Sequence, residues 1–570
     1  MSNSLGSITY HLNMKRQLIY LFTSCCLFTA GIKSASAQLM KEKEEFSRAD
    51  SLRGHLTPLR TCYDIQYYHL DVKVDIDRKF ISGTNLFRFK ATQDFKQLQF
   101  DLFANLKVNK VIYRGKELPF TREYNAVFID FPETITKGKE DEFIVSYEGH
   151  PTEAARAPWD GGFDWKKDSN GKPWIATACQ GMGASVWWPN KDHQYDEVDS
   201  MLISIAVPNG LMNVSNGKLI QIEKMKDGFT KYHWKVVNPI NNYNVALNIG
   251  DYIHFKEKYK GEKGPLDIDY YILRENNQPQ KKQHLQTNAK QTLEAFEHWF
   301  GPYPFYEDGY KLVETSHTGM EHQSAVAYGN QYQNGYRGRD ASGTGWGKKW
   351  DFIVVHESGH EWFGNNITSK DLADMWIHES FTNYSEALFI DYFYGKEASQ
   401  AYVHGNRSGI QNDKPMQGPF HVNKEGSGDM YPKGGVMLNM IRTMIDDDEK
   451  WRSILRGLNA KYFHQQVDYQ DIAQYIIEKS GIDLSKFFEQ YVQHISIPIL
   501  EIRKDISGKI LGRWISEVKD FHMPIHIGTN ENPKQLVMLD QHFKEIKIPN
   551  LTKENITIDT FNYYIGVLIE

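Results

Sequence analysis

Residues 353–365 read IVVHESGHEWFGN and combine an apolar run with two histidines four positions apart. The apolar run favours a buried helix. On a helix, His356 and His360 project from one face about 6 Å apart, so both imidazoles can bind one metal ion. Glu357 lies about 100° further round such a helix, where it cannot be a third ligand but can reach a metal-bound water. The stretch therefore predicts a buried helix that carries two ligands of a zinc ion.

A third ligand is predicted at Glu379, nineteen residues after His360, in the apolar helical stretch MWIHESF at residues 375–381. A catalytic zinc ion needs three protein ligands and one open position, and two histidines with one glutamate are an established set. Asn383 and Glu386 lie about one and two helical turns beyond Glu379, on the same face. Either could accept a hydrogen from a ligand imidazole and so fix its tautomer. From spacing alone, the histidines could instead be core residues and Glu386 a solvated acid.

Further segments agree with this zinc site. Residues 356–365 and 376–381 look like the zinc signature of one metallopeptidase family. Residues 318–322, TGMEH, are similar to its Gly-x-Met-Glu-Asn substrate strand, and residues 431–435, YPKGG, to its Tyr-x-Lys-Gly-Ala segment. Residues 63–72 look like the opening of its N-terminal β saddle. On these matches the chain resembles the aminopeptidase N family of gluzincin zinc metallopeptidases, whose relatives include leukotriene hydrolase.

The resemblance implies a role for each matching residue. The implied ligands of one zinc ion per chain are His356, His360 and Glu379. Glu357 would be the general base, Tyr431 would stabilise the tetrahedral oxyanion, and Glu321 would anchor the free α-amine of a peptide substrate. The other implied substrate-binding residues are Gln180, Gly319 and Met320. A carboxylate beside an ammonium makes a charge-assisted bond that only a free N-terminus can form, and this bond places the scissile carbonyl one residue away.

Some residues depart from the family's pattern. Thr318 and His322 replace a glycine and an asparagine in the substrate strand. His378 and Ser380 replace an asparagine and a glycine on either side of the third ligand. In a segment similar to the family's Gln-x-Glu or Gln-x-Gln, Met182 supplies no polar atom at the last position. The pocket for the amine and the first side chain is therefore expected to be less polar on that side.

The spacing of apolar residues changes twice along the chain. Residues 55–260 show the alternation of half-buried strands, and residues 261–496 show helical spacing. Short alternating runs return in residues 497–570. We therefore predict a multidomain α+β protein with an N-terminal β domain, a mainly helical zinc catalytic domain and a small C-terminal β domain. The resemblance implies that the first is a β saddle, that the second is thermolysin-like, and that the large helical C-terminal domain of longer members is absent.

The N-terminal segment has the three parts of a secretory signal. A basic pair at residues 15–16 precedes an apolar run at residues 18–32 and the small residues Ala-Ser-Ala at residues 35–37. The run is shorter than the ~20 residues of a spanning helix, which argues against a membrane anchor. Residues 1–37 are therefore predicted to be a signal peptide. The mature chain is expected to be a bacterial-type exported protein, periplasmic or extracellular, without a transmembrane segment.

Residues 38–54, after the predicted signal peptide, are predicted to be a charged linker. A lipid anchor through Cys25 is a less favoured alternative to cleavage of the signal peptide. Removal of the signal would leave Cys62 and Cys179, which could form one disulfide in an oxidising compartment. With 66 basic and 72 acidic residues the formal charge is −6. Without a basic block, the chain is not expected to bind nucleic acid.

A glycine-rich stretch, residues 329–347, resembles a phosphate loop only superficially and is predicted to be a mobile connecting loop.

Three functions fit the sequence: an exported zinc aminopeptidase acting on peptides with a free N-terminus, a zinc hydrolase of another bond such as an epoxide, and a non-catalytic peptide-binding scaffold. The complete set of ligands and the general base favour the first. The preferred N-terminal residue and the oligomeric state stay open.

Overall fold

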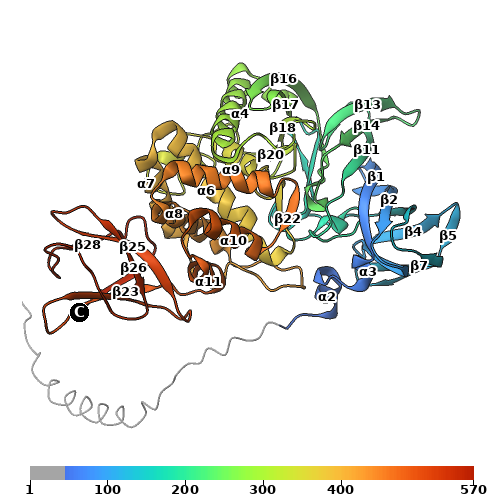
Figure 1. The fold of residues 1–570 in the computed structure, drawn as a ribbon. Coiled ribbons are helices and arrows are strands. Elements are labelled where there is room, and N and C mark those ends of the chain that lie inside the picture. The colour runs from blue at the N-terminus through green and yellow to red at the C-terminus, as the bar shows by residue number, and fades with distance from the viewer. Residues whose placement is uncertain (1–44) are drawn as a thin grey trace, which may run out of the picture. The chain divides into compact units, whose positions relative to one another are not determined.

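The structure is a computed structural model that describes residues 45–570. Residues 48–570 form one compact unit. The predicted signal peptide and the alternative lipid anchor at Cys25 lie outside the described residues. The multidomain α+β organisation is confirmed, with β-rich parts before and after a helical part (Figure 1).

The last seven residues of the predicted charged linker form a short helix, α2 (Arg48–Gly54), and a second short helix, α3 (Pro58–Thr61), follows it. Leu52 is buried, and its carbonyl accepts a hydrogen bond from Gln99 Nε2 at 3.0 Å. The carbonyl of Gly54 lies 3.2 Å from His193 Nε2. Burial of one apolar residue and satisfied carbonyls at the helix end therefore hold residues 48–54 in a helix where the charge pattern alone indicated a linker.

Three sheets form the N-terminal β domain. The largest has the strand order β13 (Lys218–Lys224), β14 (Phe229–Val236), β11 (Ser200–Pro208), β1 (Tyr63–Asp75), β2 (Phe80–Ala91), β8 (Glu140–Gly149), β4 (Leu106–Tyr113) and β5 (Lys116–Leu118). The second comprises β12 (Met212–Val214), β15 (Asn248–Gly250), β10 (Pro173–Ala178) and β9 (Gly162–Lys167). The third comprises β3 (Phe95–Asp101), β7 (Ala126–Ile135) and β6 (Phe120–Glu123).

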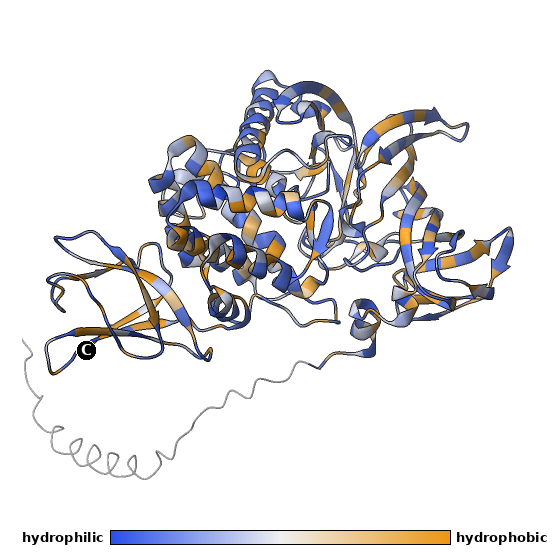
Figure 2. Ribbon diagram, in the orientation of Figure 1, coloured by the Kyte–Doolittle hydropathy of each residue, from blue (hydrophilic) through white to orange (hydrophobic). Residues whose placement is uncertain are grey.

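Alternation of side chains builds this domain. In β1 the residues Leu70, Val72 and Val74 are fully buried, and the residues between them are partly exposed. Figure 2 shows the same alternation of apolar and polar positions as orange and blue bands along these strands. Because successive side chains of a strand point to opposite faces, each sheet turns one face to a shared apolar core. Cys62 and Cys179 are both buried in that core as free thiols, so the possible disulfide is not formed in this structure.

The helical part starts with a five-stranded sheet in the order β16 (Tyr252–Gly261), β17 (Gly264–Leu273), β18 (Tyr310–Glu314), β20 (Val326–Tyr328) and β19 (Gly319–Met320). The predicted boundary at residues 260 and 261 falls within the β16–β17 hairpin, whose two strands pair along their whole length. The helices are α4 (Pro279–Phe300), α5 (Phe352–Gly359), α6 (Trp376–Tyr394), α7 (Lys396–Asn406), α8 (Pro432–Ile445), α9 (Asp448–Lys461), α10 (Tyr469–Ser480) and α11 (Ser485–Gln493). A short parallel pair, β21 (Ile367–Ser369) and β22 (Gln465–Val467), joins two loops.

Two helices position the predicted ligands. Asp351 caps the N-terminus of α5, where its carboxylate accepts hydrogen bonds from the amides of Ile353 and Val354. Helix α5 contacts strands β19 and β20 and helices α4 and α6. Helix α6 is buried over most of its length and ends at Gly395, whose positive φ of 90° a residue with a side chain would rarely adopt. The ligand helices are thus buried in the core.

The C-terminal β module contains two small sheets. One has the order β27 (Lys544–Glu545), β24 (Ile510–Ile515), β23 (Ile499–Lys504) and β29 (Gly566–Ile569), and the other β26 (Gln535–Asp540), β25 (His522–Thr529) and β28 (Ile556–Ile558). Trp514, Met523 and Leu539 are buried between them. Within residues 45–570, no helix combines the length and the apolar character that crossing a membrane would require.

Candidate active site

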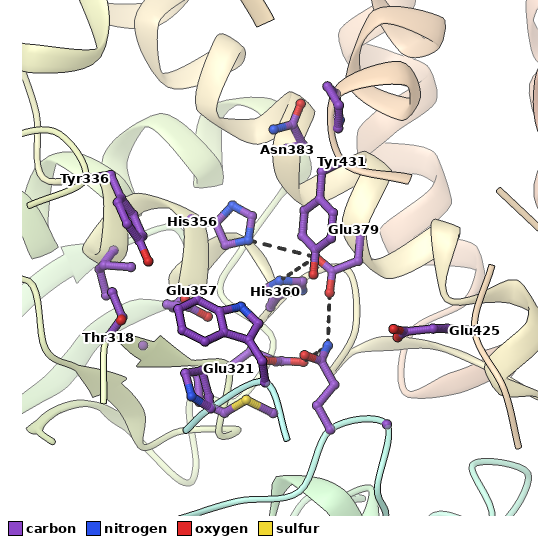
Figure 3. Close-up of a pocket in the computed structure, with 18 of the residues that line it drawn as sticks. Thr318, Glu321, Tyr336, His356, Glu357, His360, Glu379, Asn383, Glu425 and Tyr431 are labelled. Atoms are coloured by element: carbon purple, nitrogen blue, oxygen red, sulfur yellow. Dashed lines mark hydrogen bonds and ion pairs between the residues drawn. The ribbon is translucent and has the colours of Figure 1, made fainter. Parts of the chain in front are cut away.

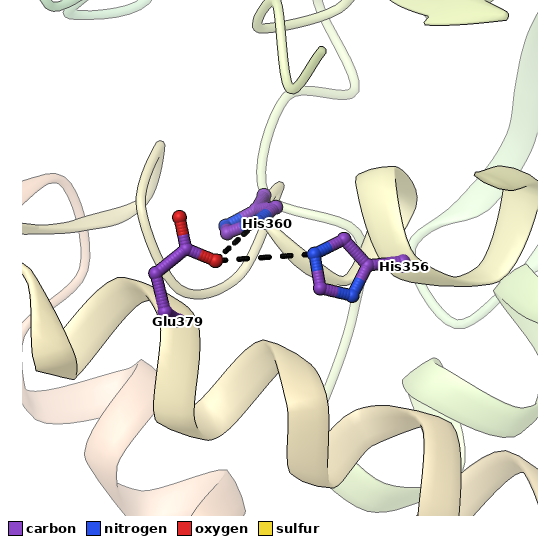
Figure 4. Close-up of side chains that lie close together, drawn as sticks. All are labelled: His356, His360 and Glu379. Atoms are coloured by element: carbon purple, nitrogen blue, oxygen red, sulfur yellow. Dashed lines mark ion pairs between the residues drawn. The ribbon is translucent and has the colours of Figure 1, made fainter. Parts of the chain in front are cut away.

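The three predicted zinc ligands meet in space. Nε2 of His356 lies 3.8 Å from Glu379 Oε2, and Nε2 of His360 lies 3.4 Å from the same oxygen (Figure 4). One donor atom from each residue lies within 4.8 Å of the other two. All three side chains are buried. Helix α5, its C-cap residue His360 and the neighbouring helix α6 therefore bring two imidazoles and one carboxylate to a single point.

Both imidazoles are oriented through their other ring nitrogen. Nδ1 of His356 lies 2.7 Å from Glu386 Oε1, and Nδ1 of His360 lies 3.0 Å from the carbonyl oxygen of Phe363. Because a carbonyl only accepts hydrogen bonds, Nδ1 of His360 carries a hydrogen, and Nε2 is the nitrogen left to bind a metal ion in place of a proton. Acceptors at Nδ1 that leave Nε2 facing the metal are typical of zinc-binding histidines.

The acidic ligand also fits a metal ion. Oε2 of Glu379 is buried and has no hydrogen-bond donor among the described residues, although a buried carboxylate oxygen is costly without a partner. Burial favours the neutral forms, but the opposite charges outweigh it: they raise the pKa of His360 to about 10 and lower that of Glu379 to about 2. The site thus favours a positive charge beside Glu379 Oε2, and a zinc ion would supply it. The donor set of two imidazoles and one carboxylate suits that ion.

Glu357 faces the same cavity from the next position of α5. It is 8% exposed, and burial raises its pKa to about 7. Strand β19 can pack this close to α5 only because residue 319 is a glycine: a Cβ on Gly319 would come within 2.5 Å of Glu357 Oε1. The structure therefore puts Gly319 against the predicted general base and leaves its carboxylate open to the pocket.

Glu321 and Gln180 lie beside the ligands, as the resemblance implied. The amide Nε2 of Gln180 donates to Glu321 Oε1 at 2.7 Å and to Glu379 Oε1 at 2.9 Å. Glu321 is 2% exposed and, with the buried Met320, lines the pocket. One amide from the N-terminal domain thus joins the predicted amine anchor to the predicted metal ligand.

Tyr431 stands at the N-terminus of α8, with its ring stacked 6.2 Å from that of His356. Close packing of α8 on α6 sets this position, because a Cβ on Gly434 would come within 1.9 Å of Ser380 Oγ. Ser380 Oγ in turn donates to the carbonyl of Met430 at 2.8 Å. Burial, with help from the nearby carboxylates, raises the pKa of Tyr431 well above its usual value, so the hydroxyl keeps its proton and can donate it.

The two residues predicted to orient a ligand imidazole differ in what they do. Glu386 contacts His356, whereas Asn383 donates its amide to Glu386 Oε1 at 3.3 Å. Tyr402, which sequence reasoning missed, donates its hydroxyl to Glu386 Oε2 at 2.6 Å. Nothing in the sequence signals Tyr402, because it lies on α7, off the helix that carries its partner.

Asn365 is a second residue whose role the sequence did not indicate. Its amide donates to the carbonyl of Glu321 at 2.9 Å, and its oxygen accepts from Asn244 of the N-terminal domain at 2.9 Å. In the sequence, Asn365 is the last residue of the stretch at residues 353–365, and nothing in that stretch indicates these two contacts. Asn365 links the predicted substrate strand to the segment that follows the ligand helix.

The departures from the family's pattern are accommodated in two ways. His322 and His378 are fully buried, and His378 Nε2 accepts a hydrogen bond from the amide of Ser369 at 2.8 Å. Thr318 and Met182 instead line the pocket. The carbonyl of Met182 accepts a hydrogen bond from the side chain of Arg53 on α2. The Met182 segment therefore contributes an apolar side chain to the pocket, while Arg53 of α2 holds its main chain.

The three predicted ligands line one cavity of about 820 Å³ together with Glu357, Glu321, Gln180 and Tyr431 (Figure 3). Residues 285–491 match the Peptidase family M1 domain, and residues 65–243 match the Peptidase M1 N-terminal domain. The chain belongs to peptidase family M1. This finding confirms the resemblance seen in the sequence.

Curated M1 relatives match the chain over part of its length. Leucyl aminopeptidase of Saccharolobus solfataricus is 23% identical over 429 residues, which are 71% of this chain and 50% of the relative. Endoplasmic reticulum aminopeptidase 1 of Mus musculus is 24% identical over 271 residues, 45% of this chain and 28% of the relative. The chain thus spans half or less of the length of these two relatives.

A solved structure shares the fold. The M1 zinc metallopeptidase of Deinococcus radiodurans, solved as a mutant with a Tyr-Ser-Ala substrate, superposes with a TM-score of 0.64 at 16% identity. The match covers 76% of this chain and 95% of the other. It supports the arrangement of a β-rich N-terminal domain followed by a helical domain.

Proposed function

We propose that this M1 family member is a zinc-dependent aminopeptidase that removes the first residue from peptides with a free N-terminus. One observation carries the proposal: the amide of Gln180 joins Glu321 to Glu379 through bonds of 2.7 and 2.9 Å. A buried carboxylate that can pair with an ammonium therefore lies directly beside the metal site. The names of the aminopeptidase relatives support the same activity.

The residues of the site have separate roles in the proposed reaction. When bound by His356, His360 and Glu379, a zinc ion supplies Lewis-acid chemistry, polarising a carbonyl and acidifying water. Glu357, whose pKa burial raises to about 7, takes the proton of the attacking water and passes it to the leaving amine. Tyr431 keeps its proton and donates a hydrogen bond to the carbonyl oxygen as that oxygen gains negative charge.

Glu321 determines which peptide bond of the substrate is cut. A metal ion, a water and a base would cleave any peptide bond that reached them, so a second contact has to measure the distance from the free amine. The carboxylate of Glu321 pairs with an ammonium far better than with a neutral amide. Fixing the amine next to Glu379 places the first carbonyl of the peptide, and no later one, over the ligands.

The proposal includes export, and its support is the signal-like pattern of residues 15–37. Sequencing the N-terminus of the protein from fractionated cells tests this part. A mature chain that starts after Ala37 in the periplasm or the medium would agree with it. A cytoplasmic chain that retains residues 15–37 would contradict it without touching the enzymatic proposal.

The decisive test compares free and N-acetylated peptides with the zinc-loaded protein. The wild type should lose most of its activity when the substrate is acetylated, because acetylation removes the ammonium. Glu321→Ala should be slow on both substrates, so that the ratio between them falls toward one. Equal rates on free and acetylated peptides in the wild type, or cuts in the middle of long chains, would contradict the assignment. Full zinc occupancy with no hydrolysis of any peptide would favour a binding scaffold.

A further inference from the structure

The glycine-rich stretch at residues 329–347, expected to be a mobile connection, is fixed to the ligand helix. Asn330 Nδ2 donates to Asp351 Oδ1 at 2.8 Å and to the carbonyl of Gly335 at 2.8 Å. The amide of Gly335 donates to the carbonyl of Trp350 at 2.7 Å. Because Asp351 also caps α5, the loop and the helix with His356 share one anchor. The loop therefore holds a defined position relative to the metal ligands.

The loop presents Tyr336 to the pocket. The ring of Tyr336 packs edge-on against Phe352, with centroids 5.5 Å apart and an interplanar angle of 85°. Phe352 stacks on the ligand His356 at 5.2 Å and 13°. Both aromatic residues are partly buried and line the cavity. A wall of aromatic rings thus runs from the loop to the metal site.

This wall lies at the end of the pocket away from the amine anchor. Asn423 Nδ2 donates to the carbonyl of Gly181 at 3.0 Å, which joins the Gln180 segment to the loop that carries Glu425. In Figure 3, Glu425 lies on one side of the ligands, and Tyr336 lies on the other side with Thr318. A peptide held by its amine at Gln180 and Glu321 therefore continues past the ligands toward Tyr336.

The lining of that end suits an uncharged ring. The residues that the glycine-rich loop and the start of α5 contribute to the pocket wall, among those the structure describes, are Tyr336, Ala341, Phe352 and Ile353, none of which is charged. Burying a charged side chain against such a wall is costly, whereas an added aromatic ring gains edge-to-face or offset contacts. We propose that Tyr336 and Phe352 form the subsite for the second residue of the substrate and select an aromatic side chain there. This inference rests on the proposed aminopeptidase function.

A peptide series tests the subsite. Tripeptides with constant first and third residues and Gly, Leu, Phe, Lys or Glu in the second position are compared by kcat/KM with zinc-loaded protein. The wild type should prefer Phe over Gly by about tenfold or more, and Lys and Glu should be the poorest. Tyr336→Leu, which keeps an apolar side chain without the ring, should reduce the Phe:Gly ratio by several-fold. Tyr336→Ala should reduce it further.

Arg339→Ala is the matched control, because Arg339 is an exposed residue of the same loop that does not line the pocket. It should keep the wild-type ratio. Calorimetric binding of the Phe and Gly peptides to zinc-loaded Glu357→Gln protein gives a second measurement that needs no turnover. The same preference should appear there and shrink in Glu357→Gln protein that also carries Tyr336→Leu.

The two measurements separate this inference from the proposed function. A wild type without preference for Phe, or a preference that Tyr336→Ala leaves unchanged, would overturn the subsite. If no peptide is hydrolysed, the proposed function fails, and the binding preference alone decides whether the aromatic subsite exists.

Discussion

The helices that carry the metal ligands and the loops that face the substrate reach the pocket in different ways. His356 lies in the last turn of α5 and His360, four positions on, is the C-cap residue that keeps helical backbone angles, so the geometry of one helix end places both. Gln180, Tyr336 and Tyr431 come from three segments far apart in the sequence and lie outside helices α5 and α6. The metal site is therefore encoded locally, whereas the substrate contacts depend on how distant segments pack.

This difference separates two kinds of variant. Changes on α5 and α6 should act first on zinc binding, since the ligands and the residues that orient them lie there. Changes on the loops should act on substrate at full zinc occupancy. Zinc binding and hydrolysis measured on the same variant therefore show to which kind it belongs.

The largest effect is expected for His360→Ala. Two remaining ligands cannot hold the ion against water, so both zinc and activity should be lost. The wild type should show the same loss with a chelator and should recover when zinc is returned. Metal analysis of the purified variant, with circular dichroism to check its fold, makes the measurement. Stoichiometric zinc in a folded His360→Ala protein would refute the ligand assignment.

Glu357→Gln lies on the same helix but should behave differently. The amide keeps the shape and leaves the three ligands intact, yet it cannot accept a proton from water. The rate should fall by about 10²–10⁴-fold at full zinc content. Single-turnover kinetics together with metal analysis test this. Near-normal turnover in the zinc-loaded variant would mean that another group is the base.

For Tyr431→Phe we expect a loss of about 10²–10³-fold in kcat with KM nearly unchanged, since the hydroxyl acts mainly on the transition state. Zinc content should stay at the wild-type level. This result would place Tyr431 with the loop residues although its ring stacks on the ligand His356. A rise in KM alone would show instead that Tyr431 binds substrate in the ground state.

The same distinction explains what could be predicted from the sequence. The helical spacing at residues 353–365 indicated α5 and the two histidines, although the helix ends at Gly359 and His360 is its C-cap residue. The turn count from Glu379 indicated that Glu386 shares its face. Glu386 does contact His356, at 2.7 Å. These inferences needed only the period of one helix. Alternation likewise indicated the strands of the N-terminal β domain, as in β1.

Contacts between segments could not be predicted in this way. Tyr402 reaches Glu386 from α7, and Asn365 reaches Glu321 from the loop after α5. The positions of Gln180 and Tyr431 came only from resemblance to a family, since no periodicity relates them to the ligands. Tyr336 escaped notice because a glycine-rich loop usually indicates mobility, while the bonds that fix this loop reach Asp351 and Trp350.

The smallest effect is expected for Tyr402→Phe. This variant tests whether the residues that position the metal ligands extend beyond Glu386 to α7. The hydroxyl of Tyr402 donates to Glu386 Oε2 at 2.6 Å, and Glu386 Oε1 holds Nδ1 of His356. Without this bond Glu386 is held less firmly, and His356 loses part of its orientation. Loss of such an indirect support typically weakens metal affinity by about 10–100-fold, and we expect the lower end because Asn383 still donates to Glu386.

Zinc affinity measured by competition with a chelator should therefore fall about tenfold in Tyr402→Phe, while the ratio of rates on free and acetylated peptides stays at the wild-type value. Tyr384→Phe is the matched control, because this buried tyrosine of α6 accepts a hydrogen bond from Trp451 and does not line the pocket. Its zinc affinity should not change. If Tyr402→Phe kept wild-type affinity, the group that positions the metal would end at Glu386. If it changed the peptide ratio instead, Tyr402 would belong with the substrate contacts, and the division between helices and loops would fail at α7.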